Sequence, residues 1–186
     1  MKIMKKPIRI MSSFAVAIAL AATAAWLTMN FSLAQQVDPS LPGGASSLRE
    51  TYQDWGVTCQ VAGKTKRCAL IQRQVQQDGL LVLAIELQIA SAGTGSGTLV
   101  LPFGLKLDGG VTLAVDDRPP RPMHFSTCLS TGCLVPLALD AKTVAGLRTA
   151  QAIKINALSS DGQKVTFTVL LKGIAAALDR IGMLEK

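Results

Sequence analysis

Residues 123–139, MHFSTCLSTGCLVPLAL, decide how the rest of the chain is interpreted. Apolar residues alternate on both sides of a short loop, namely Met123, Phe125, Cys133, Val135, Leu137 and Leu139. This period of two is typical of half-buried strands. Because strands that leave a short loop run antiparallel, Cys128 and Cys133 lie at its base, within disulfide reach. The stretch predicts a stapled β-hairpin, and Pro136 indicates an edge position in its second strand.

The same alternation recurs along the chain between short turn signals. It begins at Trp55, and the hairpin that follows places Cys68 opposite Cys59. Asp140 is positioned to cap a short helix, and the apolar spacing after Gly173 predicts a second helix at the C-terminal end. About nine short strands separated by turns predict an all-β fold, an antiparallel β-sandwich with two short helices and two local disulfides.

The first 34 residues have the composition of a secretory signal peptide. A basic start (Lys2, Lys5, Lys6, Arg9) precedes an apolar run over residues 14–29. Small residues then stand at Ser32 and Ala34, which predicts cleavage after Ala34. An uncleaved membrane anchor is the alternative, since residues 14–33 are long enough to cross a bilayer. Cleavage removes four of the 19 basic residues and none of the 12 acidic ones, so the mature chain carries a net charge of only +3.

This modest charge is a poor basis for binding nucleic acid, and none is expected as a partner. After cleavage, the chain is not expected to be an integral membrane protein. Residues 35–50 are rich in Pro, Gly and Ser and predict a flexible linker. Residues 51–186 are then one β-sandwich domain. Within that domain, the Gly/Ser-rich residues 91–98 and the proline-rich residues 116–122 are expected to be loops.

Export places the four cysteines in an oxidising compartment, which favours disulfides over thiols. The predicted hairpins pair Cys59 with Cys68 and Cys128 with Cys133. A four-thiolate zinc site is the rival interpretation, but the spacings differ from the usual zinc knuckles. No metal site and no cofactor site are predicted.

The sequence offers few groups for catalysis, and no catalytic residue is predicted. His124 is the single histidine of the chain, and as a general base it would need a nucleophile and a carboxylate brought close by the fold. The loop over residues 93–97 lacks the pattern of a phosphate-binding or dinucleotide-binding loop. Asp116 and Asp117 are interpreted as turn residues.

The candidate binding residues are the basic side chains Lys64, Lys66 and Arg67, at the tip of the first predicted hairpin. They would suit an anionic glycan or a lipid headgroup, and a solvated turn is the simpler interpretation.

The chain resembles the invasion-associated locus B family of exported proteobacterial proteins. The resemblance spans residues 55–181 and rests on the order of several short motifs: WGVTC at 55–59, CAL at 68–70, LPFG at 101–104, the Cys128/Cys133 hairpin and KGIAAAL at 172–178. Ile174 stands where the family usually has an aromatic residue. The resemblance implies a periplasmic or envelope-associated protein of a Gram-negative bacterium, and it carries no known catalytic residues.

Two functions remain open from the sequence. The favoured one is a non-enzymatic exported binding or adaptor protein of the cell envelope, which contributes to host-cell interaction or invasion. Its partner would be an envelope protein, a host-surface protein or an anionic glycan. The alternative is a hydrolase with an unfamiliar site near His124. A polar pocket that joins His124 to a carboxylate and a hydroxyl would favour the enzyme.

Overall fold

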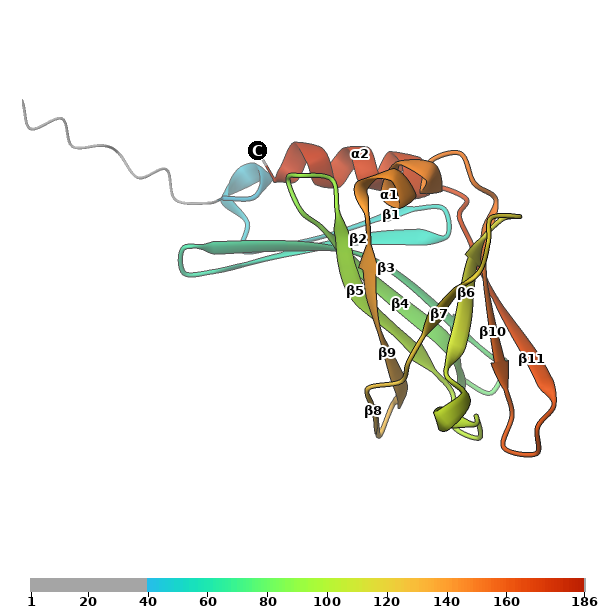
Figure 1. Cartoon of the computed structure of the whole chain (residues 1–186). Helices are drawn as coiled ribbons and strands as arrows, with labels where there is room; N and C mark the ends of the chain where they lie inside the picture. The colour runs from blue at the N-terminus through green and yellow to red at the C-terminus, as the bar shows by residue number, and fades with distance from the viewer. Residues whose placement is uncertain (1–39, 186) are drawn as a thin grey trace, which may run out of the picture. The chain divides into compact units, whose positions relative to one another are not determined.

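The computed structural model describes residues 40–185, which form a two-layered antiparallel β-sandwich with two α-helices (Figure 1). The fold class predicted from the sequence is therefore confirmed. In the described residues the strands are β1 (Ser47–Tyr52), β2 (Trp55–Ala62), β3 (Thr65–Val75), β4 (Leu81–Ile89), β5 (Gly95–Leu101), β6 (Val111–Val115), β7 (Arg121–Met123), β8 (Thr127–Leu129), β9 (Gly132–Leu139), β10 (Ala152–Leu158) and β11 (Lys164–Leu170). The helices are α1 (Ala141–Leu147) and α2 (Ile174–Leu184). The predicted signal peptide lies outside the described residues.

The strands form two sheets. The larger has seven strands in the order β1-β2-β3-β4-β5-β9-β8, and the smaller has four in the order β11-β10-β6-β7. All the pairings are antiparallel. The chain starts in the larger sheet, leaves it after β5 for β6 and β7, returns for β8 and β9, and ends in the smaller sheet with β10 and β11.

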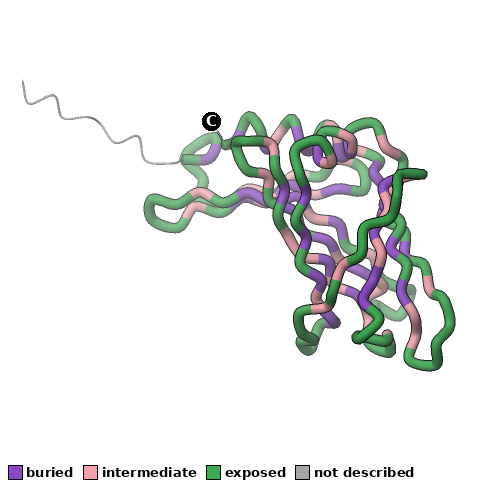
Figure 2. The backbone as a smooth tube through the Cα atoms, viewed as in Figure 1, coloured by how far each residue is buried: buried purple, intermediate pink, exposed green. Residues whose placement is uncertain are grey.

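The core lies between the facing surfaces of the two sheets, as the buried segments in Figure 2 show. Alternate residues of each strand point inward, which is the period of two seen in the sequence. The most deeply buried side chains of the sheets include Trp55, Leu70, Leu83, Ile85, Leu87, Leu99, Leu101, Ile153 and Ile155. Helix α2 adds Ile174, Ala177, Leu178, Ile181 and Leu184 from one face, and it packs against β1, β2 and β3.

The two disulfides pair as the sequence predicted. Cys59 is bonded to Cys68 between β2 and β3, and Cys128 is bonded to Cys133 between β8 and β9. The first bridge is buried at both ends, since its cysteines are 1% and 5% exposed. The second joins buried Cys133 to exposed Cys128.

The stretch 123–139 is divided between both sheets, so the predicted hairpin was too long. Met123 ends β7 and pairs with Val111 of the smaller sheet, whereas Thr127 begins β8 and pairs with Leu134 of the larger one. Residues 124–126 connect the two layers. An alternating pattern predicts which face of a strand is buried, but it does not say to which sheet the strand belongs.

The predicted linker was also too long at its C-terminal end. Residues 47–50 belong to β1, which pairs along β2 from Ser47↔Gln60 to Tyr52↔Trp55. Leu41 is only 2% exposed and belongs to the core. Strand β1 has half-exposed residues on its inward face and exposed ones on the other, so its apolar alternation is weak in the sequence.

Two predicted loops contain strand residues as well. Strand β5 starts at Gly95, inside the Gly/Ser-rich stretch, and β7 starts at Arg121, inside the proline-rich stretch. In β5 the glycine has a packing role, because a Cβ on Gly97 would overlap the carbonyl oxygen of Glu86. Glycine here permits a close approach of β4 and β5 rather than flexibility.

Side chains of the larger sheet bind the outer edge of β11. Trp55 Nε1 and Gln72 Nε2 donate to the carbonyl oxygen of Leu170, at 3.0 and 2.8 Å. Gln74 Nε2 donates to the carbonyl oxygen of Thr168 at 2.9 Å. These hydrogen bonds join the two layers on the β3 and β11 side of the sandwich.

Candidate binding site at the open side of the sandwich

On the opposite side, the sandwich is open between β7 and β9. Strand β8 pairs only with residues Gly132 to Leu134 of β9, so the rest of β9 has no neighbour on that side. Pro136 lies in this uncovered half, as its effect on strand pairing predicts. Strand β7 is the outermost strand of the smaller sheet. A crevice with a cavity of about 120 Å³ lies between these two edges.

The crevice has an apolar floor and a basic rim. Leu113, Val115 and Leu139 form the floor and are nearly fully buried, and half-buried Met123 adjoins them. Arg118 and Arg121 stand at the rim together with Pro119 and Pro122. The crevice therefore combines a small apolar cavity with two guanidinium groups.

Arg121 belongs to the inward face of the smaller sheet. Its register partner is Leu113, and the next inward pair is Val111 with Met123. The guanidinium Nη1 lies 3.6 Å from Asp140 Oδ2, and both side chains are more than half exposed, at 54% and 59%. A surface ion pair of this kind contributes little to stability. Its geometry nevertheless shows that the Arg121 guanidinium lies at the mouth of the crevice.

Asp140 caps α1 and stays ionised. Its Oδ1 accepts a hydrogen bond from the backbone N–H of Thr143 at 2.7 Å. That hydrogen bond is the main reason why the pKa of Asp140 is lowered, and the charge of Arg121 acts in the same direction. The predicted capping role of Asp140 is thus confirmed.

The guanidinium of Arg118 lies against α1 at Gly146. A Cβ on Gly146 would overlap the Arg118 guanidinium, so glycine at this helical position leaves room for the arginine. Glycine inside a helix costs about 1 kcal/mol relative to alanine. Arg118 forms no ion pair with any of residues 40–185. Its guanidinium is therefore free to pair with an anionic group of a partner.

The structure separates the basic residues that the sequence grouped together. Lys64 lies in the turn between β2 and β3, while Lys66 pairs with Val61 and Arg67 pairs with Gln60. Neighbouring strand residues point to opposite faces, so Lys66 and Arg67 do not form one patch. Arg67 lines a shallow hollow on the outer face of the larger sheet, with Thr58, Gln60, Cys68, Ala69, Glu86 and Gln88.

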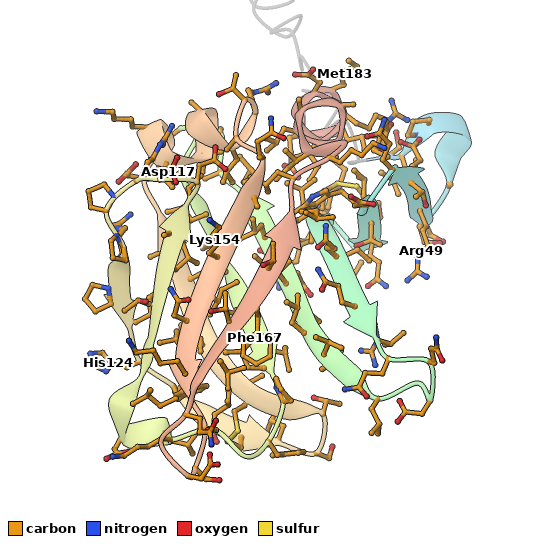
Figure 3. All side chains as sticks on the ribbon, turned by 90° about the vertical axis from the view of Figure 1, so that its right-hand side faces the viewer. Arg49, Asp117, His124, Lys154, Phe167 and Met183 are labelled. Atoms are coloured by element: carbon orange, nitrogen blue, oxygen red, sulfur yellow. A yellow bond between two sulfur atoms is a disulfide. The ribbon has the colours of Figure 1, made fainter. Side chains whose placement is uncertain are left out.

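His124 lies in the connection between β7 and β8, on the outside of the sandwich (Figure 3). It is exposed, and it makes no hydrogen bond or ion pair with another described residue. Figure 3 places Asp117 at the far end of β7 from His124. Asp116 has a positive φ of 49°, and its carboxylate accepts hydrogen bonds from the backbone of Gln151 and Ala152, as befits a turn residue. Among residues 40–185, no carboxylate and no hydroxyl forms a hydrogen bond or an ion pair with His124.

No group of three or more His, Cys, Asp or Glu side chains that could hold a metal ion occurs among residues 40–185. No helix in the same part of the chain is both long and apolar enough to span a bilayer.

The sequence did not point to the crevice, because its residues come from segments far apart in the chain. Arg118 and Arg121 lie in a stretch that its prolines marked as an exposed loop. One signal was present: Arg121 shares the odd-numbered parity of Met123, which predicts that both face inward if a strand is formed.

The family model for the invasion associated locus B (IalB) protein matches residues 55–182, which is most of the β-sandwich. The chain belongs to the invasion-associated locus B family. Among its IalB relatives, an invasion protein B homologue of Brucella abortus (strain 2308) is 47% identical over 149 residues, covering 79% of this chain and 86% of that protein. Invasion protein B of Bartonella bacilliformis is 32% identical over 151 residues, covering 79% of this chain and 81% of that protein.

A solved IalB structure has the same fold. The crystal structure of invasion associated protein B from Bartonella henselae matches with a TM-score of 0.70 and 29% sequence identity. The match covers 75% of this chain and 97% of that one.

Proposed function

We propose that this IalB protein is a non-enzymatic exported binding protein of the bacterial envelope, which contributes to the interaction with host cells. The observation that carries the proposal is the crevice between β7 and β9. It offers buried apolar surface, two arginines and uncovered strand edges in one accessible place. Concave sites with an apolar floor and a few polar groups are the usual form of a binding site.

The family supports the role in host interaction. The relatives in Brucella and Bartonella are named as invasion proteins or their homologues. Under this proposal the partner is an envelope protein, a host-surface protein or an anionic glycan, and the arginine rim favours a partner that carries negative charge.

The architecture supports binding in an exported compartment. Two disulfides hold short hairpins in the larger sheet, and bridges of this kind persist in oxidising environments. One of them closes the β8–β9 hairpin at the start of β9, and the other end of β9, at Ala138 and Leu139, lines the crevice. Strand β9 pairs with β5 from Cys133 to Leu139, so this side of the crevice is ordered before binding and loses little conformational entropy.

An infection assay tests the proposal. In a strain that lacks the gene, complementation with the wild-type protein is compared with the double variant Arg118→Gln/Arg121→Gln. The matched control is Arg49→Gln/Arg73→Gln, which changes two exposed arginines of the larger sheet. We expect the crevice variant to restore host-cell invasion poorly and the control to restore it fully, at equal protein levels.

Equal restoration by both variants would contradict the proposed site. Chemical crosslinking in intact cells, followed by identification of the captured protein, then identifies the partner directly. A catalytic turnover that depends on His124 would contradict the non-enzymatic role.

A further inference from the structure

We infer that the crevice between β7 and β9 binds the C-terminal end of an extended peptide, taking its carboxylate at the arginines and its last, apolar side chain in the cavity. The inference rests on the proposed function, because it names the kind of partner that the binding protein takes at that site. Three features of the crevice support it: its size, its charge and its free backbone groups.

The size of the cavity fits one apolar side chain. It measures about 120 Å³, and a cavity of roughly 150 Å³ holds a benzene molecule. The side chain of leucine or phenylalanine is of this size, whereas the long acyl chain of a membrane lipid is much larger. The floor residues Leu113, Val115 and Leu139 are all aliphatic, so a side chain placed there exchanges water for apolar contacts.

The charge at the mouth fits one carboxylate. Arg118 and Arg121 supply two positive charges, and Asp140 supplies one negative charge, 3.6 Å from Arg121. Arg118 makes no ion pair with any of residues 40–185, so its guanidinium, which lies beside Gly146, is available to a carboxylate. Guanidinium and carboxylate form charge-assisted hydrogen bonds of matched geometry.

The backbone of β9 offers the pairing groups of a strand edge. The carbonyl oxygen of Leu134 accepts a hydrogen bond from the N–H of Ser126, so even-numbered residues of β9 direct their backbone groups to the β8 side. Ala138 has the same parity, but β8 ends before it. Its N–H and C=O therefore face the crevice, and Ala138 is one of the residues that line the cavity. Addition of a peptide strand to such an edge is a common mode of recognition.

An inward-pointing arginine on an edge strand also has a simpler explanation, because charges at such positions block unwanted strand addition. The two explanations predict opposite results. If Arg121 only blocks strand addition, no peptide binds to the wild-type edge, and replacing Arg121 allows peptides to bind. A carboxylate-binding arginine admits strands that end in a free carboxylate, and its removal would abolish their binding.

Calorimetric titration of the chain from residue 35 onward separates these outcomes. The probe is an octapeptide with a β-forming sequence that ends in phenylalanine, prepared as the free acid and as the C-terminal amide. We expect the free acid to bind and the amide to bind about tenfold more weakly or worse, because it lacks the charged acceptor. The same peptide with aspartate as its last residue should not bind, because a second carboxylate cannot enter the apolar cavity.

Three variants locate the binding. Arg118→Gln and Arg121→Gln should each weaken binding of the free acid by about tenfold. Ala138→Pro removes only an N–H that faces the crevice, so it should weaken binding of the free acid and of the amide alike, by roughly fivefold. Arg49→Gln is the matched control and should leave binding unchanged. Thermal melts check that each variant is folded, and the arginine variants decide the question if Ala138→Pro is not.

Equal affinity for acid and amide, or binding that increases in Arg121→Gln, would overturn the inference. Binding of dodecanoate without binding of any peptide would overturn it in favour of a lipid anion. These results are separate from the infection assay. Peptide binding with no effect on invasion refutes only the proposed function, and loss of invasion without peptide binding refutes only this inference.

Discussion

Gly97 shows how strongly one residue can constrain the packing of two strands. It pairs with Leu87 across the β4–β5 ladder, and a Cβ at this position would overlap the backbone of Glu86. We expect Gly97→Ala to lower the free energy of unfolding by about 1–3 kcal/mol, because backbone atoms cannot move aside as a flexible side chain can. Denaturant midpoints at equal slope measure the effect.

The matched control is Gly182→Ala in α2, where an added Cβ meets open space. Alanine is the better helix former, so this change should raise stability by about 0.5–1 kcal/mol. A loss of stability at Gly182, or none at Gly97, would show that the backbone at these positions is not as described.

Glu50 gives stability a dependence on pH. Its two carboxylate oxygens accept hydrogen bonds from Arg180 Nε and Nη2 at 2.8 and 2.7 Å, and Tyr52 Oη donates a third at 2.8 Å. The hydrogen bonds from Arg180 are the main reason why the pKa of Glu50 is lowered. A carboxyl group whose pKa is lower in the folded state stabilises that state above its unfolded pKa, and the effect is lost as pH falls through the folded value.

We therefore expect wild type and Glu50→Gln to differ most in denaturant midpoint at pH 7. The difference should narrow as pH falls below about 4, the ordinary range of a glutamate. Glu86→Gln is the control, because Glu86 is exposed and makes no ion pair with another described residue. If the difference in denaturant midpoint between wild type and Glu50→Gln stays constant down to pH 3, the ion pair with Arg180 does not cause the lower stability of the variant.

Among the elements, the two stapled hairpins should differ in importance. Loss of either bridge costs roughly 2–3 kcal/mol by the chain-entropy estimate, with a few tenths more for the longer 59–68 loop. Cys59 and Cys68 are also buried, so their replacement removes packing at about 1 kcal/mol or more. Cys128 is exposed.

We expect Cys59→Ala/Cys68→Ala to lose more stability than Cys128→Ala/Cys133→Ala. Denaturant midpoints at equal slope compare the two double variants. Equal losses, or the reverse order, would show that the β8–β9 hairpin is held more firmly by its surroundings than its exposure indicates.

Among the elements, the sequence predicted most strands and the hairpin partners β2–β3 and β8–β9, but not which sheet each strand joins. Strong alternation revealed β2, β4 and β9, and Asp140 revealed the start of α1. Strand β1 was missed because Ser47, Arg49 and Thr51 alternate with only half-buried partners. The division of β7 from β8 was missed because Met123 and Thr127 belong to different sheets, a long-range choice that no local pattern records. The crevice depends on the same choice, so it could not be predicted.

For the whole molecule, signal-peptide cleavage determines where the mature chain begins. The small residues Ser32 and Ala34 predict cleavage after Ala34, and intact mass spectrometry of the protein recovered from the envelope measures it. We expect a chain that begins at Gln35 and has 152 residues. A product that still contains residues 14–29 would establish the membrane anchor instead.

The hydrogen bonds that Gln72 and Gln74 make to β11 bear on solubility. Identical sandwiches with open outer strands can stack through those strands into fibrils, a hazard for any protein that is crowded in a narrow compartment. Here the glutamine amides already satisfy the carbonyl oxygens of Leu170 and Thr168, and Lys164 places a charge at the opposite end of the same strand. At the Leu170 end of β11, the carbonyl oxygens of Leu170 and Thr168 are already bonded, and at the other end a second copy would meet the charge of Lys164. The molecule is thereby protected from growing by repeated addition of itself along β11.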